Sequence, residues 1–298
     1  MIGGLGRRRV GVWLGTLVAA TGLVGSEVVK TVPHRTAFPG ARYLIIAADS
    51  FVDLVQPWAE WKTAKGMLAQ VVPLSEAGST PQAVREFVRN AWSTWPVRPE
   101  YLLLVANPNQ LPGKDGNDDG FYGDMTGRYQ LELAVGRLPA FNRNECRAVI
   151  AKWQAYELAR DLSDSLWLLA GTTVVGYDDS LNPDPYYIPD CRFVHGLWLA
   201  NGYRCAESLY ANQGATLEQL RAAFNSGRSF ITYRGAACGY WDFPFWQFAP
   251  DTSWHNGRHT PIIVAATCAT VTLAPGEEML GDRAVRFGTA ESLGGAVA

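Results

Sequence analysis

The fold of this chain is decided by Tyr43-Leu44-Ile45-Ile46-Ala47-Ala48, an uninterrupted apolar run. A run of this kind is typical of a parallel strand that is covered on both faces. Apolar residues then recur at helical spacing, at Phe51, Leu54, Val55 and Trp58. The helix is expected to end at Lys65-Gly66, because glycine readily adopts the left-handed conformation that closes a helix. The stretch therefore predicts a strand followed by a helix.

The same alternation continues along the chain. We expect strands over residues 67–72 and 101–106, and between them a helix that begins at Thr80-Pro81, with threonine as its N-cap. Strands and helices that alternate with short connections predict a parallel sheet with helices on its faces. A polar loop at 107–130 follows, and its length suggests a function or a bound ion. The pattern then predicts a strand at 131–135 and a helix at 142–159.

A second alternating block begins at Trp167-Leu168-Leu169 and ends with a strand at 261–267. Between these we expect a helix over 191–200, a helix capped by Thr216 and a strand at 229–233. The polar residues 160–166 are typical of a boundary between domains. The predicted fold class is therefore α/β, with two parallel-sheet, three-layer subdomains at 40–162 and 163–298. Because the apolar residues 294–298 carry no terminating pattern, we expect the chain to be cut within the second subdomain.

Charge and composition exclude several classes of protein. The 298 residues are 48% hydrophobic, which is enough for a core, and 26 Lys+Arg oppose 28 Asp+Glu. The resulting net charge of -2 provides no basic surface for a nucleic acid or an anionic membrane. We therefore expect no nucleic-acid partner.

The N-terminus has the pattern of a signal peptide over residues 1–26. Arg7-Arg8-Arg9 precede the uncharged residues 10–24, and the small residues Gly25 and Ser26 follow. The run is short for a membrane span of roughly 20 residues, although an uncleaved anchor is the alternative. We expect a secreted or cell-surface protein with no stable membrane insertion after cleavage.

The chain has five cysteines, an odd number, and in an oxidising compartment at least one has no partner within the chain. Cys268 ends the strand predicted at 261–267, and the carboxyl ends of parallel strands are where open α/β sheets place ligands and catalytic groups. Its position favours a nucleophile, and a buried structural cysteine is the alternative. The other four, which are Cys146, Cys191, Cys205 and Cys238, could pair and leave Cys268 free.

Acidic residues gather in the polar loop, at Asp115, Asp118, Asp119 and Asp124. Oxygen ligands on a flexible loop suit Ca²⁺, although the spacing is not that of an EF-hand and a solvated turn needs no ion. Asp178, Asp179 and Asp184 form a weaker candidate. Aromatic residues between 241 and 254 are expected to lie mostly in the core, with some lining a substrate cleft.

Several strings, in this order, resemble the catalytic domain of the gingipain family of cysteine peptidases. They lie at 43–46, 61–66, 118–124, 134–140, 231–235, 265–268, 276–280 and 294–298. The resemblance implies a caspase-like second subdomain, structural calcium, a peptide or protein substrate, and attack by Cys268 on the peptide carbonyl. The backbone N–H groups of Gly235 and Cys268 are candidate oxyanion donors.

One departure from the family pattern concerns catalysis. The family has a Gly-His-Gly triplet that carries the general base or acid, and this chain has Gly235-Ala236-Ala237. His255 and His259 precede the Cys268 strand and are candidate replacements, with ordinary surface histidines as the alternative, whereas His34 and His195 lie elsewhere in the sequence. Two functions follow: a cysteine endopeptidase, or an impaired peptidase that serves as a binding or scaffold domain.

Overall fold

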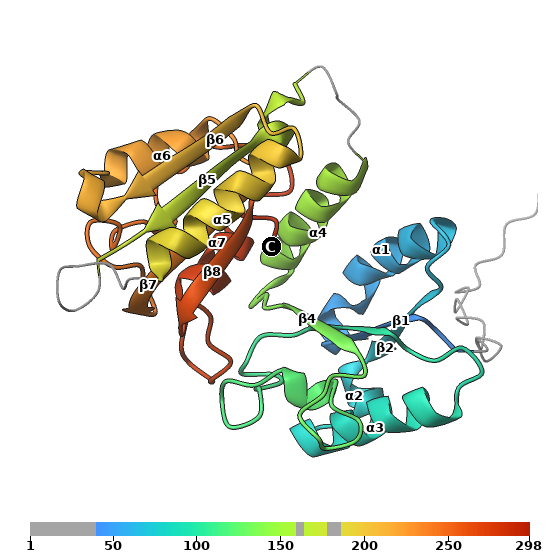
Figure 1. Cartoon of the computed structure of the whole chain (residues 1–298). Helices are drawn as coiled ribbons and strands as arrows, with labels where there is room; N and C mark the ends of the chain where they lie inside the picture. The colour runs from blue at the N-terminus through green and yellow to red at the C-terminus, as the bar shows by residue number, and fades with distance from the viewer. Residues whose placement is uncertain (1–39, 159–163, 178–185) are drawn as a thin grey trace, which may run out of the picture. The chain divides into compact units, whose positions relative to one another are not determined.

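Two four-stranded parallel sheets, each covered by helices, organise the part of the chain that the computed structural model describes, residues 40–158, 164–177 and 186–298 (Figure 1). The predicted signal peptide, most of the predicted domain boundary and the acidic residues Asp178, Asp179 and Asp184 lie outside these residues. The α/β fold class with two parallel sheets is confirmed.

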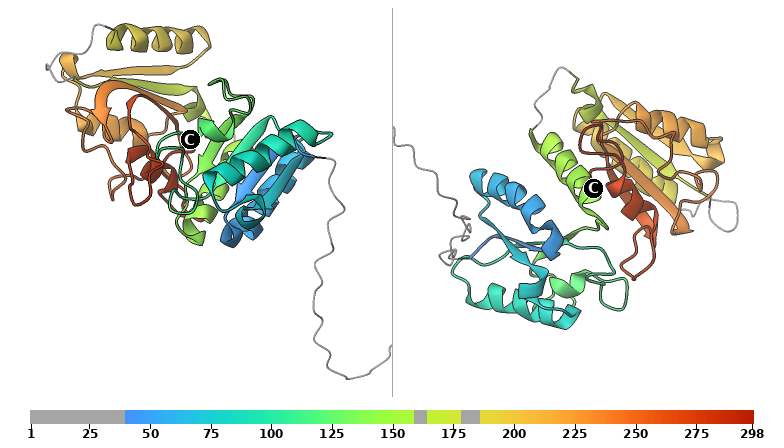
Figure 2. Two further views of the ribbon diagram at one scale, coloured as in Figure 1. Left: turned by 90° about the horizontal axis from the view of Figure 1, so that it is seen from below. Right: turned by 180° about the vertical axis from the view of Figure 1, so that it is seen from behind.

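The first sheet has the strand order β2-β1-β3-β4, with every pair parallel. Its strands are β1 (Tyr43–Ala47), β2 (Ala69–Pro73), β3 (Tyr101–Val105) and β4 (Ala134–Leu138). Its helices are α1 (Val52–Ala64), α2 (Leu74–Ala77), α3 (Pro81–Thr94) and α4 (Arg143–Leu158), with short 3-10 turns at η1 (Asp49–Phe51) and η2 (Gly120–Tyr122). Helices α1 and α4 lie on one face and α2 and α3 on the other (Figures 1 and 2).

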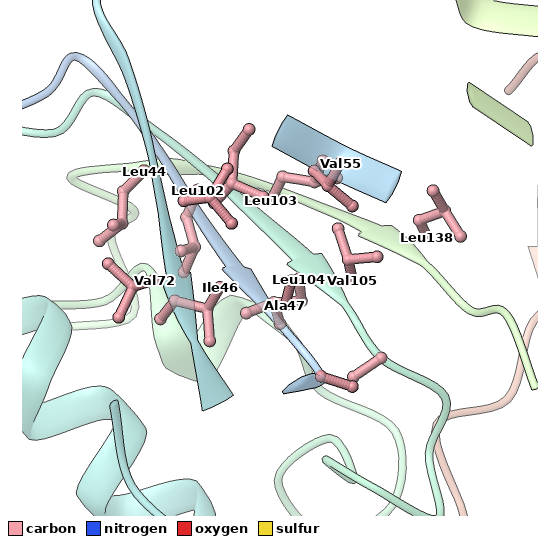
Figure 3. Close-up of a cluster of buried hydrophobic side chains, with 14 of the residues drawn as sticks. Leu44, Ile46, Ala47, Val55, Val72, Leu102, Leu103, Leu104, Val105 and Leu138 are labelled. Atoms are coloured by element: carbon pink, nitrogen blue, oxygen red, sulfur yellow. The ribbon is translucent and has the colours of Figure 1, made fainter. Parts of the chain in front are cut away.

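The local sequence explains these elements. The side chain of Thr80 accepts a hydrogen bond from the Ala83 N–H, as an N-cap does. Gly66 has a φ of 90° directly after α1, the left-handed conformation expected for it. The central strands are buried on both faces, and Figure 3 shows Leu44, Ile46 and Leu104 within their apolar cluster.

The second sheet has the strand order β6-β5-β7-β8, also parallel throughout. Its strands are β5 (Ala170–Val175), β6 (Cys205–Tyr210), β7 (Phe230–Cys238) and β8 (Ile262–Cys268). The helical elements are η3 (Leu166–Leu169), α5 (Tyr187–Ala200), η4 (Ala211–Gln213), α6 (Leu217–Asn225) and α7 (Leu280–Arg286). One core lies between this sheet and helices α6 and α7, and Cys191 of α5 packs on the opposite face.

The strands differ from the sequence prediction in detail. The strand expected at 131–135 begins at Ala134, and residues 167–169 form the 3-10 turn η3 before β5 begins. Strand β6 was not predicted, because its edge position leaves Cys205 and Glu207 at least partly exposed and the sequence lacks an apolar run there. Uninterrupted apolar runs identify strands that are buried on both faces, and so they miss an edge strand that is partly exposed to solvent.

The described residues of both sheets belong to one compact unit, which spans 37–298. Trp153 Nε1 of α4 donates to the Val297 carbonyl at 2.9 Å, and the Lys152 ammonium donates to the carbonyls of Val285 and Phe287. Among the described helices, none combines the length and the apolar character that a membrane crossing requires.

Candidate active site around Cys268

Cys268 is the last residue of β8, at the carboxyl end of the second sheet (Figure 1). Its side chain is exposed and its thiol is free. The predicted position at a strand end is therefore confirmed, and the alternative of a buried structural cysteine is wrong. An accessible thiol at this edge of a parallel sheet is placed where a substrate can reach it.

Strand β7 lies directly beside β8 and carries a bulge opposite the end of β8. Arg234 pairs with Ala266 and Cys238 with Cys268, so that residues 235–237 of β7 face only Thr267 of β8. Ala236 is exposed within this bulge. The sequence interval predicted that positions 236 and 268 come together at neighbouring strand ends, and the register confirms this. Bulges often re-aim side chains next to active sites.

The bulge is held by Asp242, a residue that the sequence analysis did not single out. Its carboxylate accepts hydrogen bonds from the Ala236 N–H at 2.6 Å and from the Tyr233 hydroxyl at 3.1 Å. Tyr233 is buried, its ring stacks on Trp241 at 4.3 Å, and burial raises the pKa of its hydroxyl. The buried phenol and its carboxylate partner therefore fix the backbone at position 236.

Gly235 lies inside this arrangement. A Cβ at position 235 would lie 2.0 Å from the Tyr233 hydroxyl and 2.7 Å from Asp242 Oδ2. Only glycine allows the backbone at position 235 to lie so close to the Tyr233 hydroxyl. The Tyr-x-Gly string at 233–235 was therefore the feature of the sequence that could have revealed this packing. The role of the Gly235 N–H as an oxyanion donor remains a prediction.

No histidine in the described residues accompanies Cys268. His255 and His259 precede β8, and a seven-residue strand separates its two ends by about 20 Å. His259 Nε2 lies 2.6 Å from Asp164 Oδ2, and His255 Nδ1 lies 2.9 Å from the Ser253 carbonyl. His195 contacts Ser208 of β6, three strand spacings or about 14 Å across the sheet from β8. The two candidate replacements are therefore wrong.

The loop at 107–130 lies against the segment that follows Cys268. The Gly113 N–H donates to the Leu273 carbonyl at 3.1 Å, and the Gly276 N–H donates to Asn109 Oδ1 at 2.8 Å. On the other side, the buried Asp282 carboxylate accepts the Thr272 N–H, and burial raises its pKa. The polar loop thus helps to position the segment that follows β8.

The four acidic residues of that loop do not converge. Asp119 forms an ion pair with Arg137 at 2.6 Å, and Asp124 accepts the N–H groups of three residues of its own turn. Within the described ranges, no group of three or more acidic, histidine or cysteine side chains is arranged to hold a metal ion. Calcium binding at Asp115, Asp118, Asp119 and Asp124 stays a prediction.

The other cysteines do not pair as expected. Cys146, Cys191 and Cys205 are free, so a pairing of four that isolates Cys268 is wrong. Cys146 is buried in the core of the first sheet, and Cys191 is buried in a small cluster with Val175 and Tyr210 of the second sheet, which separates them. Burial raises the pKa of each of these two thiols to about 12.

The aromatic segment lies mostly in the core, as the sequence predicted, and the lining of a substrate cleft by its other residues stays a prediction. Trp241, Phe245, Phe248 and Trp254 are buried in the core of the second sheet. Phe243 and Trp246 are at least half exposed, and they follow the bulge within ten residues of the chain. A separate cavity of about 440 Å³ lies near Ile262, at the amino end of β8, and so it does not belong to the site at Cys268.

The two parallel sheets of this α/β fold agree with the cysteine-peptidase class that the sequence strings predicted. Residues 36–298 match peptidase family C25, and the chain belongs to that family. The family resemblance inferred from the sequence strings is therefore confirmed.

Relatives and solved structures agree with the family. Lys-gingipain HG66 of Porphyromonas gingivalis is 27% identical over 246 residues, which are 68% of this chain and 14% of that protein. Lys-gingipain W83 of the same species is 27% identical over 47% of this chain and 9% of its own length. The chain thus spans less than a sixth of the length of these relatives.

The crystal structure of the Arg-specific cysteine proteinase gingipain R has the same fold. It matches 87% of this chain and 62% of its own length, with a TM-score of 0.76 and 20% identity. The complex of the Porphyromonas gingivalis RgpB pro- and mature domains gives a TM-score of 0.75 over 86% of this chain and 62% of that one, with 19% identity.

Proposed function

We propose that this chain is an exported, gingipain-like cysteine endopeptidase domain in which Cys268 is the nucleophile. The observation that supports the proposal is the accessible, free Cys268 thiol at the end of β8, beside the bulge at 235–237. The substrate class is a peptide or protein, and the proposed location is secreted or at the cell surface.

In the proposed reaction the Cys268 thiolate adds to the carbonyl carbon of the scissile bond. The C–N bond breaks, the amine leaves with a proton, and water hydrolyses the thioester to return the thiol. The N–H groups of Gly235 and Cys268 are proposed to stabilise the negative charge on the carbonyl oxygen. Asp242 acts as a positioning residue, because it holds the backbone of the bulge.

The missing imidazole sets the expected rate. A positioned general base or acid contributes about 10²–10⁴-fold, and position 236 carries alanine. We therefore propose slow turnover on peptide bonds, whose amine leaving group needs a proton. Reaction with activated esters, whose leaving group departs unaided, is less affected.

The second candidate function is a catalytically impaired domain that binds protein partners. It is favoured by the distance of each described histidine from Cys268 and by Ala236 in the family's histidine position. The two candidates differ in whether Cys268 is more reactive than an ordinary exposed thiol.

Acylation by p-nitrophenyl acetate tests this difference. We expect a burst of p-nitrophenolate and an acetyl group on Cys268, located by peptide mapping, at least about tenfold faster than acetylation of the exposed Cys205. Cys205→Ser is the matched control and keeps the burst, whereas Cys268→Ala loses it. Equal rates at both thiols would contradict the peptidase proposal and favour the binding domain.

A further inference from the structure

Two loops leave the second sheet at the carboxyl ends of the neighbouring strands β7 and β8, where Cys268 lies (Figure 1). They span residues 239–246 and 269–279. The first loop lies against the end of the second, because the Leu280 N–H donates to the Gly239 carbonyl at 3.3 Å. The two loops therefore lie together at the strand end that carries Cys268.

Three large apolar side chains of these loops are exposed to solvent. The exposed fractions are 59% for Tyr240, 59% for Phe243 and 55% for Val271. We call these three residues the apolar rim. Exposed apolar side chains that occur singly are common, whereas several that gather in one place mark a binding surface.

Two members of the apolar rim lie close to Cys268 along the backbone. Val271 is the third residue after Cys268, so their Cα atoms are within about 11 Å of each other. Tyr240 is the second residue after Cys238, which pairs with Cys268 in the register of β7 and β8. A peptide bound at the Cys268 thiol therefore passes near both residues.

Phe243, the third member of the apolar rim, is held beside the bulge by its neighbours. The Asp242 carboxylate accepts the Ala236 N–H at 2.6 Å, which brings residue 243 back to the end of β7. The Phe243 ring stacks on Tyr177 with a centroid distance of 6.2 Å, and the Phe243 carbonyl accepts the Tyr177 N–H at 3.0 Å. The ring is thus positioned before a ligand binds, which lowers the entropy cost of binding.

The charged side chains of the two loops already have partners. They are three carboxylates, of which Asp242 accepts the hydrogen bonds of the bulge. Glu278 forms an ion pair with Arg286 at 2.7 Å, and Glu277 accepts the Thr272 hydroxyl at 3.2 Å. A cationic side chain bound between these loops would lose water without gaining a free carboxylate from them.

We propose that the apolar rim binds an aromatic or large aliphatic side chain of a peptide at Cys268. The contact removes apolar surface of both partners from water, and hydrophobic contacts of this kind discriminate between side chains by about 10–200-fold. The substrate class rests on the proposed function: the preferred substrate carries such a residue beside the scissile bond, and a lysine there is disfavoured. Binding to the apolar rim itself is independent of catalysis.

Alkylation by two matched reagents tests the proposal without the need for turnover. N-iodoacetyl-phenylalanine amide and N-iodoacetyl-lysine amide each form a thioether with a cysteine thiolate and release iodide, and peptide mapping by mass spectrometry gives the rate at each cysteine. Cys205 is the internal standard, because it is exposed and begins β6, at the opposite edge of the described sheet from β8. We expect the ratio of the phenylalanine rate to the lysine rate to be at least about tenfold higher at Cys268 than at Cys205.

Variants locate the preference in the apolar rim. Phe243→Ala is expected to lower the rate ratio at Cys268 at least about threefold. Val271→Glu lowers it as well, because a carboxylate at that position attracts the lysine reagent. Phe193→Ala, the matched control, changes another exposed phenylalanine on α5 and keeps the wild-type ratio. The wild-type comparison of Cys268 with Cys205 needs no variant, so it decides the test even if a variant fails to fold.

Several outcomes would overturn the proposal. Equal rate ratios at Cys268 and Cys205, or a preference of Cys268 for the lysine reagent, contradict it, as does a wild-type ratio in both Phe243→Ala and Val271→Glu. A preference for phenylalanine without the p-nitrophenyl acetate burst would contradict the peptidase proposal and leave the apolar binding surface in place. A burst without the preference would do the reverse.

Discussion

At the scale of single residues, the site depends on the close approach of Gly235 to Tyr233 and Asp242. The Asp242 carboxylate bonds the Ala236 N–H at 2.6 Å, and a side chain at 235 has no room beside it. The bulge beside Cys268 is therefore stabilised by specific contacts, and these contacts are present although position 236 carries alanine in place of the family's histidine.

Gly235→Ala is expected to destabilise the chain by about 1–3 kcal/mol, because the new methyl group overlaps the Tyr233 hydroxyl. Urea unfolding followed by tryptophan fluorescence measures the change. Gly196→Ala is the matched control, because a Cβ there meets nothing within 4 Å and lies in helix α5, so that about 0.5–1 kcal/mol of stabilisation is expected. A Gly235→Ala chain as stable as the wild type would show that position 235 has room for a side chain beside Tyr233.

At the scale of elements, helix α4 of the first half is joined to helix α7 of the second by Lys152. Its side chain is 1% exposed, and its ammonium donates to the Val285 and Phe287 carbonyls. Burial lowers the pKa of Lys152 to about 7. The unfolded chain, with the ordinary value of 10.5, binds this proton more tightly than the folded chain does.

The contribution of Lys152 to the free energy of unfolding is therefore expected to rise with pH between about 7 and 10.5, by at most about 1.4 kcal/mol per pH unit. Below pH 7 Lys152 is protonated in both the folded and the unfolded chain, so its contribution no longer changes with pH. Urea titrations at several pH values should give a smaller slope for Lys152→Met than for the wild type. An unchanged slope in Lys152→Met would show that the lysine is charged in the folded protein.

The loop at 107–130 is a second element with a testable property. We propose calcium there from the acidic sequence, and Asp115 and Asp118 remain exposed while Asp119 is paired with Arg137. An ion that binds only the folded state raises its melting temperature by mass action. We expect a lower melting temperature in excess EDTA than in millimolar CaCl₂. Equal melting temperatures in the two solutions would contradict the calcium proposal. MgCl₂ is the control for ionic strength.

At the scale of the whole molecule, the proposed export depends on residues 1–26, which lie outside the described structure. A cleaved signal peptide leaves a mature N-terminus near residues 26–30. Mass spectrometry of the protein from its native cells should find that N-terminus outside the cytoplasm. Intact Met1 on cytosolic protein would contradict export.

The sequence was sufficient for the fold wherever burial leaves a periodic pattern. The apolar runs of β1 and β3 and the capped helices at Thr80 and Thr216 appear as predicted. Strand β6 was missed, because an edge strand with polar side chains carries no such pattern.

The site was predictable in part for a similar reason. Cys268 and its neighbour Ala236 follow from strand ends and sequence strings, whereas the contact of Asp242 with the Ala236 N–H depends on a loop that folds back. Loop geometry of this kind is set by tertiary packing, so periodicity does not encode it. The ion pair of Asp119 with Arg137 likewise joins residues from two different segments of the chain, which the local sequence does not reveal.

Peptide hydrolysis by Ala236→His with Ala237→Gly, which restores the family triplet beside Cys268, shows whether Cys268 is a nucleophile that lacks only its base. The register of β7 and β8 places position 236 next to Cys268, so a base returned there should raise the rate by about 10²–10⁴-fold over the wild type. Addition of Cys268→Ala to this variant should abolish the gain. A folded variant with no gain on a library of peptide substrates, or a gain that survives Cys268→Ala, would contradict the assignment of Cys268 as a nucleophile that lacks only its base.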